Sequence, residues 1–167
     1  RAGQERIRIL VIKLGALGDF IYALGPMQAI RRHHPQAEIT LLTRPAYAAL
    51  GERSGLFDNI WADCEPKLFD IPGILALRTK FTGAAFERVY DLQTSDRTGF
   101  YYRLFWPGRK PEWSGIVRSC SHYHHYERPT LIHTQDRHRT QLEIAGIKDV
   151  RPSDLTFMDS DIQRFGL

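Results

Sequence analysis

The sequence predicts an α/β fold, a Rossmann-like parallel sheet with helices on both faces. Segments with strand-like and helix-like patterns alternate along the chain, and this order produces parallel strands joined by right-handed crossover helices. The segment at residues 7–12 is apolar on both alternating faces apart from Arg8, which is typical of a strand in the middle of such a sheet. The 167 residues fit one domain of ordinary size.

The first half of the chain contains three expected strands and two expected helices. After the strand at residues 7–12, apolar residues recur at three- and four-residue spacing from about Asp19 to His33, which predicts a helix. Pro35 follows this helix and ends it. The next elements are a strand, a helix and a strand, expected at residues 38–43, 46–53 and 59–62.

The second half continues the alternation. A helix, a strand and a helix are expected at residues 72–82, 88–92 and 96–105. Beyond them, residues 116–117 are expected to form a strand, 122–126 a loop and 134–145 a last helix. Residues 1–152 are thus interpreted as one domain. Residues 153–167 are interpreted as the start of a linker with a short apolar strand and one helical turn.

Composition excludes several classes of function. No apolar run approaches the ~20 residues that a membrane span needs, and the first six residues lack the apolar core of a signal peptide. Cys64 and Cys120 do not form a disulfide framework, so a reduced, cytoplasmic setting is expected. The net charge of +4 permits an anionic partner but does not require one.

The turn after residues 7–12 is the first candidate site, because ligands bind at the carboxyl ends of strands in open α/β sheets. Gly15 and Gly18 would let the backbone approach a ligand, and Asp19 stands at the helix start. The spacing matches neither the dinucleotide fingerprint nor a P-loop, and a carboxylate would repel a phosphate. Asp19 therefore suits a base or an acceptor for a hydroxyl group. The alternative is a plain helix N-cap, and the two roles are compatible.

A second candidate site is the polar loop after the fourth expected strand, Asp91-Leu-Gln-Thr-Ser-Asp-Arg97. Gln93, Thr94 and Ser95 could form hydrogen bonds with a sugar-like ligand, and Arg97 could hold a carboxylate or a phosphate. In a parallel sheet this loop lies on the same edge as Asp19. Capping of the next helix by Ser95 or Asp96 is the structural alternative.

Two further clusters carry weaker signals. Basic residues interleave with aromatic ones between positions 97 and 118, and this stretch could face an anionic ligand. Surface arginines are common, so a solvated helix face is the favoured interpretation. His122, His124 and His125 lack the spacing of a zinc site, and no cysteine pair supports one. We therefore predict no metal site, and the roles of these histidines stay open.

The sequence resembles glycosyltransferase family 9, the lipopolysaccharide heptosyltransferases. The resemblance rests on four segments in order, which are Arg8–Asp19 with its following helix, Ile39–Arg44, Tyr90–Arg97 and His133-x-x-x-Arg137. It covers about residues 6–167. Two positions depart from the family pattern: Gly25 stands where a proline is frequent, with Pro26 after it, and Thr94 stands where many members have glycine.

The resemblance implies a two-domain GT-B enzyme in which the first Rossmann-like half binds the acceptor. The second half, which would bind the nucleotide-sugar, is not part of these 167 residues, so the isolated domain is expected to be inactive. An acceptor hydroxyl would attack the anomeric carbon of ADP-heptose with inversion, and Asp19 would take its proton. No metal or other cofactor is implied. The acceptor is a lipid-linked phosphorylated sugar of the lipopolysaccharide inner core, so peripheral contact with the inner membrane surface is expected.

The resemblance and the polar loops together give a set of candidate acceptor-binding residues. They are Lys13, Gly15, Gly18, Gln93, Thr94, Ser95, Arg97, Arg103, Arg109 and His133. Lys13, next to the glycine turn, and Arg97, in the glutamine loop, are the first candidates to hold the acceptor's phosphates or carboxylates.

Two other classes of function stay open. The chain could be a stand-alone Rossmann-like module that binds a nucleotide or a small anion, although the incomplete glycine fingerprint argues against it. It could also be a nucleic-acid or protein interaction domain that uses the basic stretch after Arg97. The low net charge argues against that reading, so no nucleic-acid partner is expected.

Overall fold

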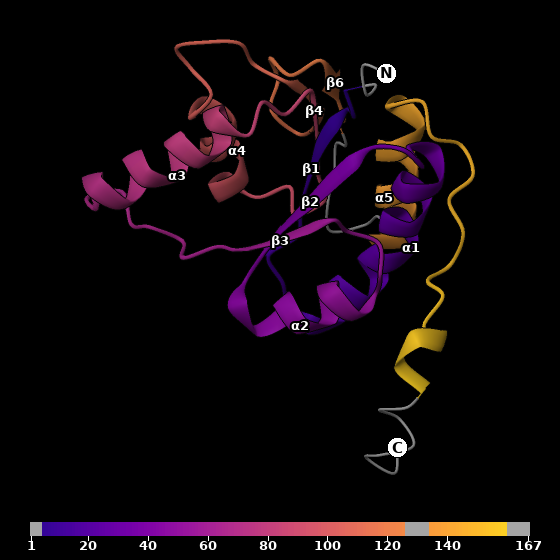
Figure 1. Ribbon diagram of the computed structural model, residues 1–167. Coiled ribbons are helices and arrows are strands. Elements are labelled where there is room, and N and C mark those ends of the chain that lie inside the picture. Colours follow the sequence, from indigo (N-terminus) through magenta and orange to yellow (C-terminus); the bar gives the residue numbers. More distant parts are fainter. Residues whose placement is uncertain (1–4, 126–133, 160–167) are drawn as a thin grey trace.

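The computed structural model describes residues 5–125 and 134–159, and these contain the expected parallel sheet (Figure 1). Its six strands are β1 (Arg8–Ile12), β2 (Glu38–Thr43), β3 (Asn59–Ala62), β4 (Arg88–Asp91), β5 (Glu112–Gly115) and β6 (His122–Tyr123). They lie in the order β3-β2-β1-β4-β5-β6, and every neighbouring pair is parallel. The strand order reverses between β1 and β4. This reversal is the switch point at which open α/β sheets bind their ligands.

Helices cover both faces of the sheet. They are α1 (Leu17–His33), α2 (Pro45–Arg53), α3 (Ile71–Gly83), α4 (Asp96–Arg103) and α5 (Thr134–Ile144), followed by the 3-10 turn η1 (Thr156–Met158). Helices α1, α2 and α5 pack on one face, and α3 and α4 pack on the other (Figure 1). The predicted fold class is therefore confirmed.

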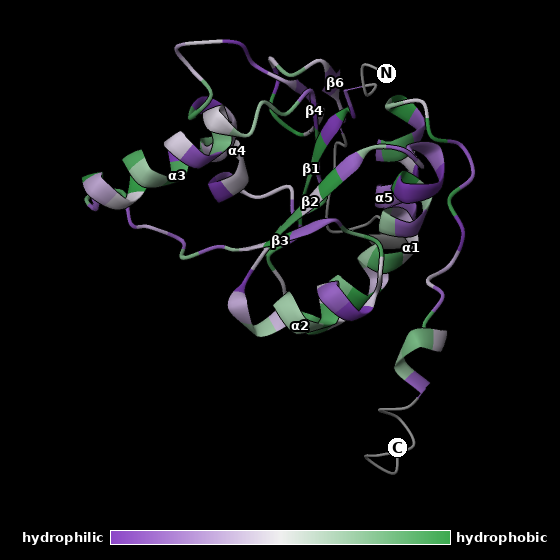
Figure 2. Ribbon diagram, viewed as in Figure 1, coloured by the Kyte–Doolittle hydropathy of each residue, from purple (hydrophilic) through white to green (hydrophobic). Residues whose placement is uncertain are grey.

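The apolar character of β1 follows from its position between two cores. Ile9 and Val11 point into the core beneath α1 and α5, whereas Leu10 and Ile12 point into the core beneath α3 and α4. All four side chains are buried. Because successive strand residues point to opposite faces, only a strand covered on both sides needs an unbroken apolar run. In Figure 2, β1 is green along most of its length.

The last two strands differ from the prediction. Residues 112–115 form the fifth strand in place of 116–117, and His122–Tyr123, expected in a loop, pair with it as a sixth strand. Neither segment has the alternating apolar pattern of a strand. Backbone pairing creates them instead: β5 pairs with β4, in the register Val89 to Trp113, and β6 pairs with β5. The short strand expected near residues 155–158 is the 3-10 turn.

The segment after α5 forms hydrogen bonds with the middle of α1, next to Pro26. Proline has no N–H group and disrupts the helical hydrogen bonds around it. At this point the Ser153 hydroxyl accepts a hydrogen bond from the Gly25 N–H at 2.9 Å and donates to the Ile21 carbonyl at 2.8 Å. A Cβ on Gly25 would lie 2.5 Å from the Arg151 carbonyl oxygen. The glycine therefore lets this segment approach α1 closely.

Candidate functional site

The glycine turn lies at the carboxyl end of β1, as predicted, and the strand order places it at the switch point. The strand's hydrogen bonding extends to Lys13, whose N–H donates to the Leu42 carbonyl at 3.0 Å. Gly15 then adopts φ +144°, and a Cβ there would lie 2.7 Å from the ring of Tyr47. Glycine is required at this position by both conformation and space. Gly18 is different, because a Cβ there would meet nothing within 4 Å.

Asp19 is exposed in the first turn of α1. The helix begins at Leu17, two residues earlier than expected, and its N-cap residue is Ala16, which forms no side-chain capping bond. The interpretation of Asp19 as the N-cap is therefore wrong. Its carboxylate lies at the positive end of the helix dipole, which favours a negative charge there. It is open to solvent at the carboxyl end of β1, where an acceptor hydroxyl could approach.

Lys13 is buried behind the turn. Its ammonium lies 3.5 Å from the Leu92 carbonyl oxygen. Burial lowers the pKa of Lys13 to about 8, while the nearby Asp19 and Asp91 carboxylates oppose the shift. The lysine is thus mainly protonated at neutral pH and supplies a fixed positive charge near Asp19. With 2% of its surface exposed, Lys13 lies in the interior and not on the surface of the turn.

The polar loop after β4 holds the glycine turn in place. The side-chain carbonyl of Gln93 accepts hydrogen bonds from the N–H groups of Leu14 at 3.1 Å and Gly15 at 3.3 Å. Asp91 is fully buried, and its Oδ1 accepts from the N–H groups of Gln93 at 3.1 Å and Thr94 at 2.9 Å. Burial raises the pKa of Asp91 to about 6 against the effect of these bonds. The two candidate loops therefore form one unit.

Most polar groups predicted to bind the acceptor are occupied within the loop and the helix that follows it. Ser95 and Thr98 form a capping box at the start of α4, so the capping interpretation of Ser95 is confirmed. The hydroxyl of Thr94 is the exception in this loop, because it is buried and forms no hydrogen bond with the described residues. Arg97 donates to the Pro66 carbonyl at 3.2 Å and to the Tyr101 hydroxyl at 3.4 Å, which ties it to the segment before α3.

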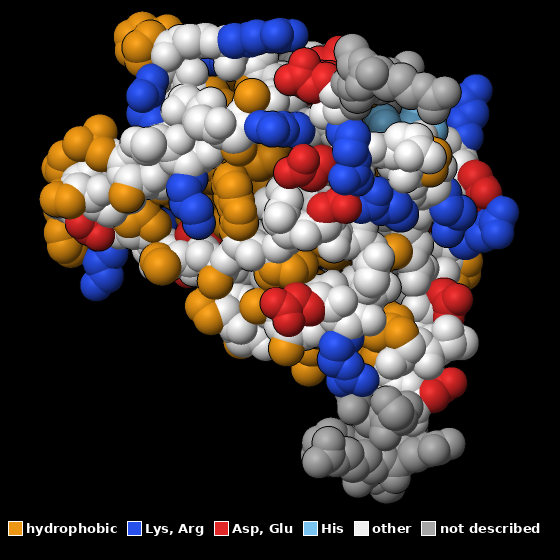
Figure 3. Space-filling view, in the orientation of Figure 1, with side chains coloured by type: hydrophobic (Ala, Val, Ile, Leu, Met, Phe, Trp, Pro, Cys, Tyr) orange, Lys and Arg blue, Asp and Glu red, His pale blue; other side chains and the backbone are white. Residues whose placement is uncertain are grey.

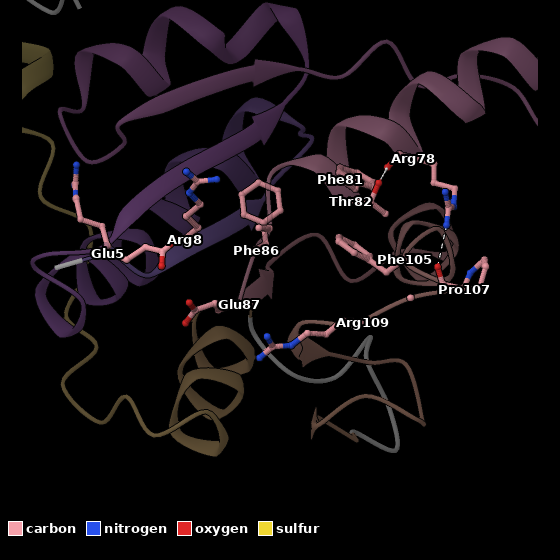
Figure 4. A pocket seen from close by; sticks show the side chains of 13 residues that line it. Glu5, Arg8, Arg78, Phe81, Thr82, Phe86, Glu87, Phe105, Pro107 and Arg109 are labelled. Carbon is pink, nitrogen blue, oxygen red and sulfur yellow. Dashed lines mark hydrogen bonds between the residues drawn. The ribbon is translucent and has the colours of Figure 1, made fainter. Parts of the chain in front are cut away.

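Arg103 and Arg109 do not join Asp19. Arg103 lies in the last turn of α4 and lines a cleft of about 700 Å³ with Lys110 and Arg118. Arg109 lines a separate cavity of about 500 Å³ that also contains Arg8, at the start of β1, and Glu87, just before β4 (Figure 4). This cavity is at the amino edge of the sheet, opposite to Asp19. His133 lies outside the described residues.

Helix α5 contributes two buried polar residues that the sequence reasoning missed. The His138 Nε2 atom lies 3.2 Å from the Leu92 carbonyl oxygen, the same oxygen that Lys13 approaches. Burial, with the nearby Lys13 charge, lowers the pKa of His138 to about 4, so the ring is neutral at pH 7. Gln141 donates to the Asp91 carbonyl at 2.8 Å.

The sequence contains a pattern that could have indicated that His138 and Gln141 are buried. His138 and Gln141 share the helix face of Leu142 and Ala145, which are buried. These four residues recur at the three- and four-residue spacing of the apolar stripe of a helix. Polar residues at such positions have partners in the interior, and here the partners are the loop after β4 and Ser114 of β5.

The histidines near β6 do not form a cluster with other metal-binding side chains. His122 and His125 lie beside Ser121 and Tyr123, at 2.9 and 3.0 Å respectively. Across residues 5–125 and 134–159, no group of three or more His, Cys, Asp or Glu side chains is arranged to hold a metal ion. Among the helices of the same residues, none has the length and apolar character that crossing a bilayer requires.

Comparison with solved structures matches this chain to halves of larger proteins. A glycosyl transferase family 9 protein from Veillonella parvula aligns with a TM-score of 0.71 and 21% identity, over 96% of this chain and 50% of its own. Escherichia coli heptosyltransferase WaaC with ADP-2-deoxy-2-fluoro heptose aligns with a TM-score of 0.69 and 14% identity, over 94% of this chain and 54% of its own. WaaC with ADP aligns with a TM-score of 0.66 and 14% identity, over 94% of this chain and 53% of its own.

The chain thus spans about half the length of the solved structures that it matches. No family model matches the sequence, and the search of curated proteins found no match. At these identities the likeness establishes the fold, and the fold is the one that the family resemblance implied.

Proposed function

We propose that this chain is the acceptor-binding half of an inverting glycosyltransferase that transfers heptose from ADP-heptose to the lipopolysaccharide inner core. One observation carries the proposal. An exposed carboxylate, Asp19, stands at the switch point of a sheet whose fold matches half of a family 9 glycosyltransferase and half of WaaC. WaaC has been solved with ADP and with ADP-2-deoxy-2-fluoro heptose, which supports a nucleotide-sugar donor.

In the proposed reaction, the acceptor hydroxyl attacks the anomeric carbon as the bond to the ADP oxygen breaks. Asp19 accepts the hydroxyl proton, and ADP leaves with the electron pair. The exposed position of Asp19 at the helix start lets a hydroxyl approach, and the buried Lys13 ammonium places a positive charge near it. The residues of this half require no metal or other cofactor for this step. The donor is bound mainly by a second domain after the linker that begins near residue 153.

The glycine turn supplies the shape of the acceptor site. Gln93 holds the N–H groups of Leu14 and Gly15, so the turn is fixed before any ligand arrives. Preorganisation of this kind reduces the entropy lost on binding. The lipid-linked acceptor implies a location at the cytoplasmic face of the inner membrane.

The test is the Asp19→Asn variant in the complete enzyme, assayed with ADP-heptose and a deacylated core acceptor. The change keeps the size of the side chain and removes its basicity, so we expect kcat to fall ~10²–10⁴-fold with little change in KM. Turnover within a factor of a few of the unchanged enzyme would reject the role of Asp19.

A second measurement separates the proposal from a stand-alone binding module. We expect the acceptor to raise the Tm of this chain, and to raise that of the Asp19→Asn variant by a similar amount, because the change removes the base and leaves acceptor binding nearly unchanged. Stabilisation by ADP or NAD, and none by the acceptor, would instead indicate a nucleotide-binding module.

A further inference from the structure

Helix α3 and the loop before it expose an unusual concentration of apolar side chains. Leu68, Phe69, Ile71 and Leu75 have 74%, 80%, 58% and 55% of their surfaces exposed. These four residues, named here the α3 surface, lie within one stretch of eight. Figure 3 shows hydrophobic side chains gathered at this end of the molecule, and Figure 2 shows the green residues of α3. Contiguous apolar patches on soluble proteins mark interaction sites.

The α3 surface is not explained by packing of the helix. The buried Phe81 and the half-buried Ile74 and Leu77 already anchor α3 on the core beneath α4. A surface helix normally presents polar residues on its opposite face, but here the outward residues include Ile71 and Leu75. The helix is therefore apolar on two sides, and its outer side has no covering element among the described residues.

Lysines border the α3 surface, and the two nearby acids, Asp70 and Glu65, form a hydrogen bond and an ion pair. Lys67 is exposed next to Phe69, and Lys80 is exposed near the other end of α3. Asp70 caps α3 by accepting a hydrogen bond from the Gly73 N–H at 3.1 Å, and Glu65 pairs with Arg44 at 2.7 Å. The surface therefore presents apolar side chains with exposed lysines at both ends, Lys67 over the Phe69 ring and Lys80 over the Trp61 ring, and with the Asp70 carboxylate between them.

A second exposed aromatic residue lies in a segment bonded to α3. Trp106 is 69% exposed, and it precedes Pro107, whose carbonyl accepts a hydrogen bond from Arg78 of α3 at 3.0 Å. Tryptophan is enriched where proteins meet the boundary between lipid and water.

We infer that the α3 surface inserts into the headgroup region of an anionic lipid bilayer. The combination of exposed leucine and phenylalanine with flanking lysines is that of a peripheral membrane anchor, whereas lysine is depleted at protein interfaces. The loop before α3 follows the carboxyl end of β3, so the α3 surface begins at the sheet edge that carries Asp19. The inference builds on the proposed function, because a lipid-linked acceptor requires the site to meet a membrane.

The test is sedimentation of this chain with vesicles that contain no sugar acceptor. We expect binding to vesicles of phosphatidylcholine mixed with phosphatidylglycerol, and much weaker binding to phosphatidylcholine alone. Phe69→Ser should weaken binding about tenfold, because a large apolar side chain no longer enters the lipid. Lys67→Gln should weaken it about fivefold.

Matched controls place the change on the α3 surface. Ile144→Ser alters a residue that is 44% exposed on α5, on the other side of the sheet, and Lys148→Gln removes an exposed cation near it; neither should affect binding. Leu68→Ser serves as a second variant, and circular dichroism checks that each variant is folded.

Several results would overturn the inference. They are no binding to anionic vesicles, equal binding to both kinds of vesicle, and equal losses in Phe69→Ser and Ile144→Ser. A concentration-dependent dimer that Phe69→Ser dissociates, without vesicle binding, would assign the surface to a second copy of the chain. Because neither donor nor acceptor is present, these outcomes do not depend on whether the enzyme transfers heptose.

Discussion

The turn after β1 and the loop after β4 lie side by side at the switch point, but they use their polar groups in opposite ways. The first turn starts α1 with no side-chain cap and leaves Asp19 exposed. The second loop consumes its polar groups internally, because Asp91 and Ser95 accept backbone hydrogen bonds and Gln93 holds the neighbouring turn. Sequence polarity alone does not distinguish the two.

The difference assigns a division of labour. The loop after β4 acts as a scaffold that positions the glycine turn, and the glycine turn presents the reactive group. Lys13 and His138 contact the start of this loop from the interior, since both approach the Leu92 carbonyl oxygen. A change at Asp19 should therefore affect the chemistry, whereas changes in the loop after β4 should affect stability.

The largest expected effect is at Asp19. In the complete enzyme, Asp19→Asn should reduce kcat by ~10²–10⁴-fold because a general base is lost. The Tm should stay nearly constant, because the side chain is exposed and makes no cap. A kinetic assay beside a thermal melt measures both. A fall in Tm that accounts for the lost activity would break the comparison.

A smaller effect is expected at Asp91, on the stability of the fold. The folded chain holds the Asp91 proton up to a pKa of about 6, whereas an unfolded aspartate loses it near ~3.9, so unfolding releases a proton between these values. The free energy of unfolding should therefore fall by about 3 kcal/mol as pH rises through this window.

The Asp91→Asn variant isolates this contribution. Its amide cannot ionise and can still accept the two backbone hydrogen bonds, so the variant should lose this decline and be the more stable protein at pH 7. His138 acts in the opposite direction, because its pKa is lowered to about 4, and it is present in both proteins. Urea denaturation of the unchanged chain and the variant from pH 4 to pH 7 measures the difference in their free energies of unfolding. Parallel curves would contradict the prediction.

Gly15→Ala should destabilise the fold by roughly 1–3 kcal/mol, because a side chain at φ +144° is strained and its Cβ meets Tyr47. Gly18→Ala is the matched control, since a Cβ there has open space and alanine favours the helix. Thermal melts of the two variants provide the comparison. Equal stabilities would show that the first turn does not require its glycine conformation.

The smallest effect is expected at Ser95. Ser95→Ala removes the cap of α4 and should cost ~1 kcal/mol of stability. The kcat of the complete enzyme should change less than threefold, roughly, because a cap far from the reacting atoms adds no transition-state contact. A loss of activity comparable with that of Asp19→Asn would mean that this loop also contacts the substrate, and the division of labour would fail.

The extent to which the sequence predicted the fold depended on the length of each pattern. The second and third strands were predicted with their observed ends, and the helices to within two residues at each end, because their apolar spacing and their flanking Pro and Gly residues are local signals. The fifth and sixth strands were mispredicted. The fifth strand pairs with β4, which is remote from it in sequence, and the sixth pairs with the fifth. Trp113 is buried against Tyr102 and Phe105, contacts that no local pattern indicates.

The candidate site was predicted in part for the same reason. The expectation that the glycine turn and the polar loop share one sheet edge followed from the parallel sheet and is confirmed by the bonds from Leu14 and Gly15 to Gln93. Arg109 was grouped with them because of its charge. It lies at the amino edge, because α4 runs back along the sheet before residue 109 is reached.

The sequence by itself determined the alternation of strands and helices, the burial of the first strand and the position of Asp19 after it, because each depends on residues that are neighbours in the chain. Only the tertiary structure decided which polar groups remain available. Burial of Lys13, the contacts of His138 and Gln141 with the loop after β4, and the bridge from Ser153 to α1 join segments that are far apart in sequence. A local pattern states whether a side chain is polar, whereas its availability depends on the atoms that long-range packing brings to it.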